Sequence, residues 1–408
     1  MPTAVTPHRI ERCTFTLAFN GFADPTGGYA DGPAEAFREY LLTCGARRVV
    51  TITHPLRPEA PGRHVIDLDG AGGRSRRTVR LPHRPPWTFP LDVAVPLRST
   101  PCDVWVGFNP LAAARGLLER RRGRAAQVVT WNIDFVPDRF GTGRLTAAYD
   151  AIDSLVARRA DHRVELSEAA AEGRAKRHGL GGQGAPVTIV PMGAWCDRTA
   201  TTAAHDSLTT IRVAYVGHLV GRQGVDRLLE AAAQLRRNGH VVEAQIIGAG
   251  PESTALEQRS RALGLDRVVT FHGFVPDQRK VESILARCNV AVAPYRDDPA
   301  SFTRFADPGK LKVYLAAGLP LVLTPVPPNA GELRECGAAL VVDDDPAAIA
   351  TGIARWVSDR DLWLSGRKAS IDHARRYDWP TLFAPLLHRL GIDATVGHEP
   401  PEAATTAA

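Results

Sequence analysis

The sequence predicts an α/β protein with two doubly wound parallel sheets, one in each half of the chain, facing each other across a cleft. Short runs of β-branched and aromatic residues alternate with longer helical patterns along most of the 408 residues. The runs are apolar throughout, which is typical of parallel strands covered by helices on both faces. A chain of this length exceeds one typical domain and fits two of about 200 residues each.

The first half contains the elements of one such sheet. We expect strands at residues 13–19, 48–53, 64–68, 104–108, 127–132, 162–166 and 187–191. Helical windows separate them at residues 33–44, 111–121, 143–159 and 168–178. The stretch 55–100 is rich in Pro, Gly and Arg and breaks the alternation, which predicts either a loop-rich insertion or a set of short strands.

The second half repeats this architecture after a polar, Thr-rich stretch at residues 194–210, which has the composition of a linker. We expect strands at residues 212–217, 243–250, 268–274, 290–295, 319–324 and 339–342. The expected helices cover residues 224–237, 252–263, 278–287, 308–317, 329–335, 346–359 and 361–376. Ligands of open α/β sheets bind at the carboxyl ends of the strands, so the cleft between the two sheets is the expected site.

Composition and charge exclude several classes of partner. The net charge is +6, and 45 of the 50 basic residues are arginine, a bias that GC-rich coding of the actinobacterial kind explains. Anion binding is the alternative explanation. No basic stretch is interleaved with aromatic residues, which argues against nucleic acid. Contact with an anionic membrane surface stays open, although no basic amphipathic helix is evident.

The chain shows no targeting, disulfide or metal signature. No run of about 18 apolar residues predicts a transmembrane helix, and we interpret the apolar stretch 13–19 as a strand rather than a signal peptide. The six cysteines stand singly, without a CxxC pair, which predicts a reducing, cytoplasmic location. No set of His, Cys and carboxylate residues has the spacing of a zinc site, so no metal is expected.

Glycine-rich turns follow several of the expected strands. Gly27 and Gly28 lie between the first strand and the first helix, where free N–H groups can meet an anion, and a plain turn explains them equally well. Gly248 and Gly250, in the turn IIGAGPE, can border a base or a ribose, or can serve tight packing alone.

The loop after the first strand of the second half is a candidate phosphate-facing turn. It opens with Gly217 and His218 and leads into a helix. Arg222 in this loop can form forked hydrogen bonds with a diphosphate. The alternative is a surface loop with an exposed arginine.

A second anion signal comes from the helix expected at residues 308–317. Asp307 and Pro308 predict its cap and its first residue. Lys310 then falls in the first turn, where a cation is unfavourable unless an anion binds there. Thr324 ends the strand that follows this helix and is expected to face the cleft.

These segments resemble, in order and spacing, the donor-binding half of GT-B glycosyltransferases, in particular the retaining family 4. The matching pieces of the second half are YVGHL, GVDRLLEA, IIGAGPE, VTFHGFVP, ADPGKLKVYLAAGLPLVLT and GELRECGAALVVDDD. In the first half, the glycine pair with its helix and the segment WNIDFVPDRFG (131–141) resemble the acceptor-binding side.

The resemblance implies a domain organisation. Residues 1–193 would form an N-terminal acceptor-binding Rossmann-like domain, and residues 211–375 a C-terminal nucleotide-sugar-binding one, joined by the linker 194–210. A helix at residues 376–391 would bridge back to the first domain. The tail 392–408 has a composition that indicates disorder.

The resemblance also implies roles for individual residues. Arg222 and Lys310 would hold the donor diphosphate and, with Asp134 as the polar group of the acceptor side, form the catalytic set. At the position of Asp134 the family often has a histidine. The residues expected to bind the donor are Gly27, Gly28, Gly217, His218, Gly248, Gly250, Asp307, Thr324 and Glu332.

Three positions depart from the family pattern. Family members usually carry one glutamate at the transferred sugar and another at the ribose, and Phe305 and Val313 occupy these positions here. Gln223 stands where a lysine of the donor loop is usual. A displaced carboxylate could come from Asp297, Asp298 or Asp307, although the first two fit a solvated turn equally well.

The implied reaction is transfer of a sugar from a nucleotide-diphosphate sugar to an acceptor hydroxyl or amine, with retention and with no cofactor. Polysaccharide, glycolipid and natural-product acceptors all fit. The departures keep an alternative open, namely a catalytically silent homologue that binds a nucleotide sugar or a partner protein. Turnover with release of the nucleoside diphosphate would separate the two.

Overall fold

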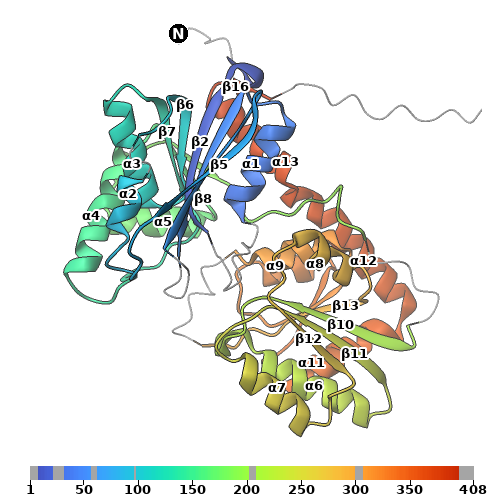
Figure 1. The fold of residues 1–408 in the computed structure, drawn as a ribbon. Coiled ribbons are helices and arrows are strands. Elements are labelled where there is room, and N and C mark those ends of the chain that lie inside the picture. Colours follow the sequence, from blue (N-terminus) through green and yellow to red (C-terminus); the bar gives the residue numbers. More distant parts are fainter. Residues whose placement is uncertain are drawn as a thin grey trace, which may run out of the picture.

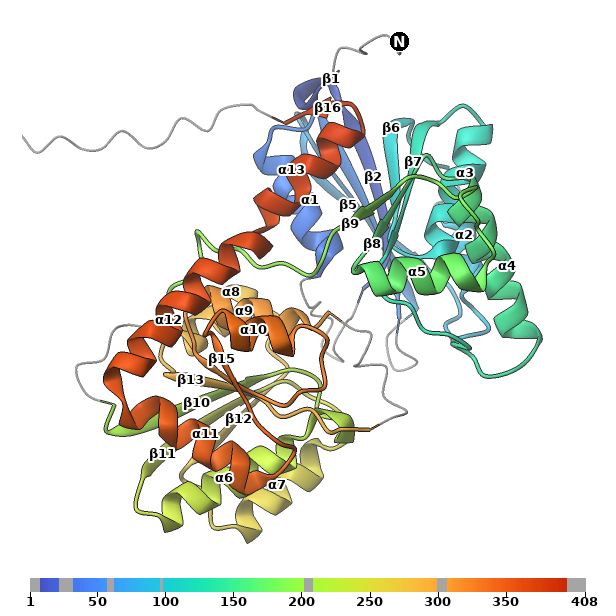
Figure 2. The ribbon, with the colours of Figure 1, turned by 180° about the vertical axis from the view of Figure 1, so that it is seen from behind.

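The computed structural model describes residues 8–21, 32–56, 62–95, 98–201, 208–298 and 307–394. Two large sheets form, one in each half of the chain, and helices cover them (Figures 1 and 2), while a third sheet has only two strands. The α/β class expected from the alternation of strands and helices is confirmed.

The first sheet has eight strands in the order β5-β4-β3-β2-β6-β7-β8-β9. They are β2 (Thr14–Gly21), β3 (Arg48–Pro55), β4 (Arg63–Gly70), β5 (Gly73–Arg80), β6 (Cys102–Gly107), β7 (Ala125–Asn132), β8 (His162–Glu165) and β9 (Val187–Ile189). The helices of this domain are α1 (Pro33–Thr43), α2 (Pro90–Ala94), α3 (Pro110–Arg121), α4 (Arg144–Arg159) and α5 (Glu168–Arg177).

The stretch 55–100 contains a hairpin and a short helix. β4 pairs antiparallel with β3 and with β5, and α2 follows the hairpin. β5 lies at the edge of the sheet and carries four arginines, charges that discourage pairing with another chain. The strand expected at residues 64–68 forms, but it belongs to a hairpin of two eight-residue strands rather than to a set of short strands.

The second sheet has six parallel strands in the order β12-β11-β10-β13-β14-β15. They are β10 (Thr210–Val216), β11 (Val241–Ile247), β12 (Val269–Gly273), β13 (Val290–Ala293), β14 (Leu321–Leu323) and β15 (Ala339–Val341). The helices are α6 (Val225–Arg237), α7 (Ser253–Ala262), α8 (Gln278–Leu285), α9 (Gly309–Ala316), α10 (Ala330–Glu335), α11 (Pro346–Ser358) and α12 (Arg360–Ala374).

The chain returns to the first domain after α12. Figure 2 shows α13 (Trp379–Arg389) running from α12 to the side of α1. The ring of Phe383 lies 5.0 Å from that of Phe37 and 5.9 Å from that of Trp131, so α13 completes the core of the first domain. The short strand β16 (Ile392–Asp393) then pairs with β1 (His8–Arg9).

Each sheet has one point at which the strand order reverses. The reversal lies between β2 and β6 in the first sheet and between β10 and β13 in the second. In open α/β sheets, ligands bind outside the carboxyl ends of the strands at such a switch point. The topology therefore marks one candidate ligand site in each domain.

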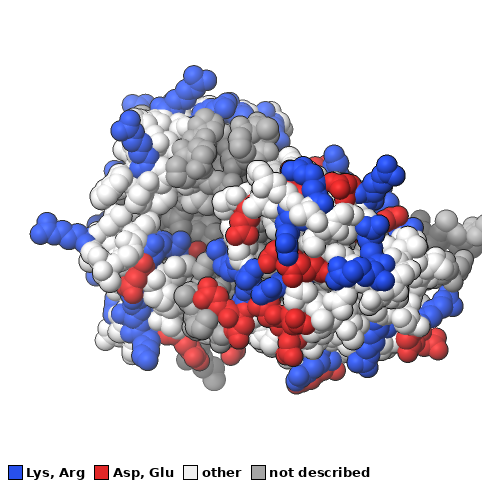
Figure 3. Space-filling model, turned by 90° about the horizontal axis from the view of Figure 1, so that it is seen from below, with Lys and Arg blue, Asp and Glu red and all other residues white. Residues whose placement is uncertain are grey.

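Two features of the chain bear on a membrane or a nucleic acid as a partner: the apolar character of its helices and the distribution of its charges. Across the described ranges, no helix combines the length and the apolar character needed to cross a membrane. On the face shown in Figure 3, the coloured Lys and Arg side chains are interspersed with Asp and Glu. The excess of arginine does not form a continuous basic surface among these coloured residues.

Candidate active site

The loop that follows β10 lies at the switch point of the second sheet. It runs from Gly217, with φ of 147°, through a short 3-10 helix to Gly224, with φ of 67°. A Cβ on Gly224 would lie 1.8 Å from the carbonyl oxygen of Pro294, which follows β13. Only glycine lets this loop approach the end of the neighbouring strand so closely.

Lys310, in the first turn of α9, reaches into this switch point. Its ammonium lies over the rings of Tyr215 and Tyr295, 4.2 and 4.9 Å from their centroids. Lys310 Nζ donates to Gln223 Oε1 at 2.5 Å and to the Tyr215 hydroxyl at 3.2 Å. A Cβ on Gly217 would lie 2.8 Å from this nitrogen, so the missing side chain makes room for it.

The charge of Lys310 is not balanced by the chain described here. No carboxylate within the described ranges pairs with its ammonium, and burial lowers its pKa to about 7. The positive end of α9 adds to the same potential. Lys310 keeps partial contact with solvent. Lys310 is therefore a partly accessible amine at the switch point, with no carboxylate partner in the described part of the chain.

Asp307 does not cap α9 as expected. The N-cap is Pro308, and no side chain caps this helix. Instead, one oxygen of Asp307 accepts from the backbone N–H of Met192 at 2.7 Å, and the other pairs with Lys312 Nζ. Lys312 is fully buried, so its ammonium takes the carboxylate that the sequence pattern assigned to the helix end.

The Asp307→Asn variant tests this use of the carboxylate. We expect it to lower the free energy of unfolding by about 2 to 3 kcal/mol, because it keeps an acceptor for Met192 but leaves Lys312 without a counter-charge. Urea denaturation measures the change. Asp372→Asn, which breaks an exposed pair with Lys368, is the matched control and is expected to leave the midpoint unchanged. Equal midpoints for both variants would contradict the assignment.

Thr324 and Glu332, both expected near the donor, interact with other parts of the chain. Thr324 is fully buried and donates its hydroxyl to the carbonyl oxygen of Tyr295 at 2.7 Å, so it does not face a cleft. The cause is the close packing of β14 against the segment after β13. Glu332, in α10, is half-exposed, and its carboxylate lies 3.4 Å from His373 and 3.6 Å from Arg376.

Gly248 and Gly250 bring two loops into contact. A Cβ on Gly248 would lie 1.9 Å from the carbonyl oxygen of Gly217, and a Cβ on Gly250 would lie 2.2 Å from that of Leu219. Tight packing therefore accounts for both glycines. His218 lies between these contacts, and its carbonyl oxygen accepts from the Tyr215 hydroxyl at 3.3 Å.

The structure describes some of the remaining residues predicted on the donor side, and others lie outside the described ranges. Arg222 sits beside Gln223 in the loop, and its carbonyl oxygen accepts from the N–H of Arg296 at 3.0 Å. Val313 is half-buried against the core of the second domain. Gly27, Gly28 and Phe305 lie outside the described residues.

A pocket opens at the switch point of the first sheet. It is lined by Asn20, Leu56, Phe89, Phe108, Asn109, Pro110, Leu111, Asn132, Ile133, Asp134, Phe135, Val136, Arg139, Phe140, Tyr149, Asp150, Asp153, Arg174 and Arg177. Asp134 follows β7, is half-exposed and pairs with Arg139. The expected acceptor-side residue thus lies on a pocket wall.

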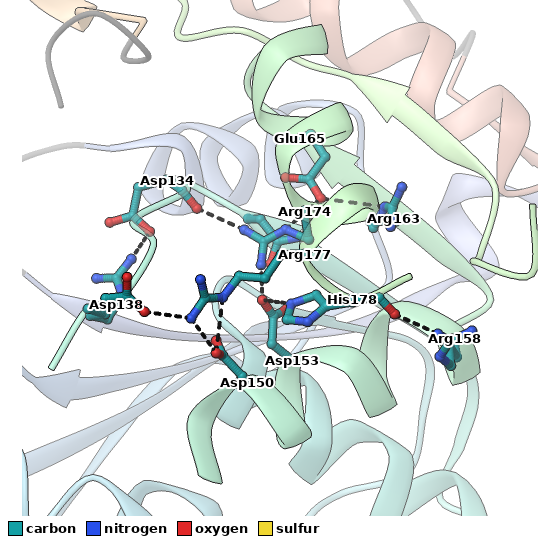
Figure 4. Close-up of polar contacts among 12 residues, drawn as sticks. Asp134, Asp138, Asp150, Asp153, Arg158, Arg163, Glu165, Arg174, Arg177 and His178 are labelled. Carbon is teal, nitrogen blue, oxygen red and sulfur yellow. Dashed lines mark hydrogen bonds and ion pairs between the residues drawn. The ribbon is translucent and has the colours of Figure 1, made fainter. Parts of the chain in front are cut away.

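A buried ionic network that the sequence pattern did not reveal forms part of this wall (Figure 4). Arg174 is 3% exposed and pairs with Glu165 at 2.9 Å and with Asp153. It also donates to the backbone carbonyl of Asp134 at 2.9 Å. Arg174 therefore fixes the segment that carries the predicted acceptor-side carboxylate.

A second buried cluster, of His54, His64 and Asp92, was also missed. The two imidazole Nδ1 atoms lie 2.8 Å apart. Burial lowers the pKa of His54 to about 3 and that of His64 to about 4, and raises the pKa of Asp92 to about 7. Of the described residues, this is a group whose side chains could together hold a metal ion.

Comparison with known proteins relates the second domain to a family. Residues 210–359 match the family model described as glycosyl transferases group 1. Over 186 residues, the chain is 27% identical to a GDP-mannose-dependent alpha-(1-6)-phosphatidylinositol dimannoside mannosyltransferase of Mycobacterium tuberculosis. The aligned region covers 46% of this chain and 45% of the relative. The chain thus matches about half the length of this curated relative.

Solved structures extend the likeness to almost the whole chain. A sucrose-phosphate synthase from Thermosynechococcus elongatus has a TM-score of 0.65 at 17% identity, covering 93% of this chain and 99% of that one. HepE of Anabaena, in complex with UDP and glucose, has a TM-score of 0.62 at 17% identity with the same coverage. Identities this low show a shared fold alone. The chain has the GT-B fold, and its residues 210–359 match the family model described as glycosyl transferases group 1.

Proposed function

We propose that this protein is a retaining glycosyltransferase that moves a sugar from a nucleotide-diphosphate sugar to an acceptor hydroxyl or amine. The observation that carries the proposal is Lys310. Its ammonium lies in the first turn of α9, at the switch point of the domain matched as glycosyl transferases group 1. It has no carboxylate partner among the described residues, and a diphosphate supplies the missing negative charge.

The same geometry supports a mechanism. Breaking the bond between the sugar and the donor leaves negative charge on the diphosphate. Lys310 and the free N–H groups at the start of α9 would face that charge, and Arg222 in the neighbouring loop would add a second cation. Charges fixed in place before the reaction stabilise the transition state without reorganisation. We propose no cofactor, because the cations of the chain supply this charge.

The pocket of the first domain supports a hydroxyl-bearing acceptor. Asn132 Oδ1 and Asp153 Oδ1 lie on residues that line it, and both oxygens are buried without a hydrogen-bond partner in the described part of the chain. Buried acceptors of this kind are costly unless a donor reaches them. Both oxygens are closed to solvent in this structure, so an acceptor hydroxyl would reach them only after the pocket opens, whereas the half-exposed carboxylate of Asp134 at the rim would orient the hydroxyl that reacts.

The experiment is a thermal-shift screen with UDP, GDP and TDP, followed by assays of nucleoside-diphosphate release with the matching sugars. GDP-mannose is the first donor to try because the mannosyltransferase relative is named for it. We expect one nucleotide to raise the melting temperature and its sugar to turn over with an acceptor. No shift with any nucleotide would contradict the donor site.

The alternative is a catalytically silent homologue that binds a nucleotide sugar. The positions of Val313 and Gln223 favour it, since a glutamate and a lysine are usual there. Gln223 nevertheless keeps a place in the site, because it accepts from Lys310 Nζ. Stabilisation by a nucleotide without turnover on any donor and acceptor pair would support this alternative.

A further inference from the structure

The cluster of His54, His64 and Asp92 plays no part in the proposed transfer reaction. The three side chains come from β3, from β4 and from α2, and they are 1%, 2% and 6% exposed. His54 and His64 stand opposite each other on β3 and β4, one position beyond Thr53 and Val65, which form the last pair of this antiparallel ladder. Asp92 closes the group from the helix that follows the hairpin.

The positions of the potential ligand atoms fit a small metal ion. The two Nδ1 atoms are 2.8 Å apart, and each lies 3.8 Å from Asp92 Oδ1. The point equidistant from the corners of this triangle lies about 2.0 Å from each atom, which is the length of a bond from zinc to nitrogen or carboxylate oxygen. The three atoms thus converge on one centre, and around a tetrahedral ion the two Nδ1 atoms, now at hydrogen-bonding distance, would move apart by about 0.5 Å.

We propose that His54, His64 and Asp92 bind one Zn²⁺ ion, with an open fourth position for water. Two imidazoles and one carboxylate suit zinc better than magnesium or calcium, which prefer oxygen ligands.

The surroundings orient the carboxylate for this role. Asp92 Oδ2 accepts from Asn20 Nδ2 at 2.9 Å, which leaves Oδ1 directed at the histidines. Asn20 Oδ1 in turn accepts from Asn109 Nδ2 at 2.7 Å. Ligand carboxylates in metal sites are commonly held by such outer hydrogen bonds. The positive charge of nearby Arg115 is balanced by Glu119 at 2.9 Å.

The ion would fasten the hairpin and α2 to the carboxyl edge of the first sheet. Asn20, which holds Asp92, and Phe89, next to α2, both line the pocket of the first domain. Zinc at this place is therefore a structural support for one wall of that pocket.

The test uses the full-length protein after treatment with dipicolinate and desalting. Titration with ZnCl₂ is expected to load one ion per chain, measured by inductively coupled plasma mass spectrometry, and to raise the melting temperature. CoCl₂ is expected to give the visible absorption bands of a four-coordinate ion. If the wild-type protein binds neither metal, the cluster is a metal-free hydrogen-bonded network of the two histidines, and the proposal fails.

Two variants assign the binding to these residues. His64→Gln and Asp92→Asn are each expected to weaken zinc binding by at least about 100-fold. His272→Gln, which removes an imidazole bonded to Gln245 in the second domain, is the control and should bind as the wild type does. Zinc binding by folded His64→Gln at wild-type affinity would place the ion elsewhere. Should a variant not fold, the cobalt spectrum of the wild type still decides, because a band from cobalt–thiolate bonds would place the ion at cysteines and overturn the proposal.

Discussion

Replacing Lys310 with methionine is expected to abolish stabilisation of the protein by its nucleoside diphosphate and to lower turnover by about 100- to 1,000-fold. The reason is that no carboxylate of the described chain pairs with Lys310, whose pKa burial lowers to about 7, so a bound diphosphate would favour its protonated form and form the ion pair that the ligand-free protein lacks. Methionine keeps most of the volume between Tyr215 and Tyr295 and removes only the charge and the hydrogen bonds.

The same substitution should have the opposite effect on the ligand-free protein. Burial lowers the pKa of Lys310 from 10.5 to about 7. Below pH 7 the lysine is charged in both the folded and the unfolded chain, and the full cost of burying the charge is present. Between pH 7 and 10.5 the unfolded chain binds more protons, so this cost falls as pH rises. Methionine is therefore expected to stabilise the ligand-free protein most below pH 7.

Two measurements check the Lys310 prediction. Melting temperatures of wild type and Lys310→Met, with and without nucleotide, are compared from pH 6 to pH 9. Lys368→Met, which removes an exposed lysine paired with Asp372, serves as the control and should keep the full nucleotide shift. A wild-type shift in Lys310→Met would show that the diphosphate binds elsewhere.

Lys310 could be found from the sequence because its signal is local. A lysine two residues after the proline that starts a helix is unusual on electrostatic grounds alone. Its partners Tyr215 and Gln223 could not be found in this way. They come from another part of the chain, and the reversal of strand order between β10 and β13 brings them to Lys310.

The wrong predictions have a common physical cause. Asp307 has the position of a helix cap, but the burial of Lys312 decides where its carboxylate binds. Thr324 directly follows β14, yet the chain after β13 covers it instead of leaving it at a cleft. Local rules describe what a residue can do, and tertiary packing selects among these options. The cluster of His54, His64 and Asp92 was missed because its members share no local spacing and meet only through the hairpin.

The second large effect is expected from Arg174, which we predict to be essential for the fold of the first domain. Arg174→Met should lower the free energy of unfolding by about 3 to 5 kcal/mol, because it leaves the buried carboxylates of Glu165 and Asp153 without their shared partner. Arg163, 3.5 Å from Glu165, compensates for only part of this loss.

Arg177, one turn of α5 further along, provides a matched comparison. It pairs with Asp150 and Asp138 on the outer side of the network (Figure 4). Because these pairs are exposed to solvent, Arg177→Met is expected to cost less than about 1 kcal/mol. Both variants remove one arginine from the pocket wall, so charge alone would affect them equally. Urea denaturation of the two therefore separates a structural role from an electrostatic one, and a similar loss in both would contradict the structural role of Arg174.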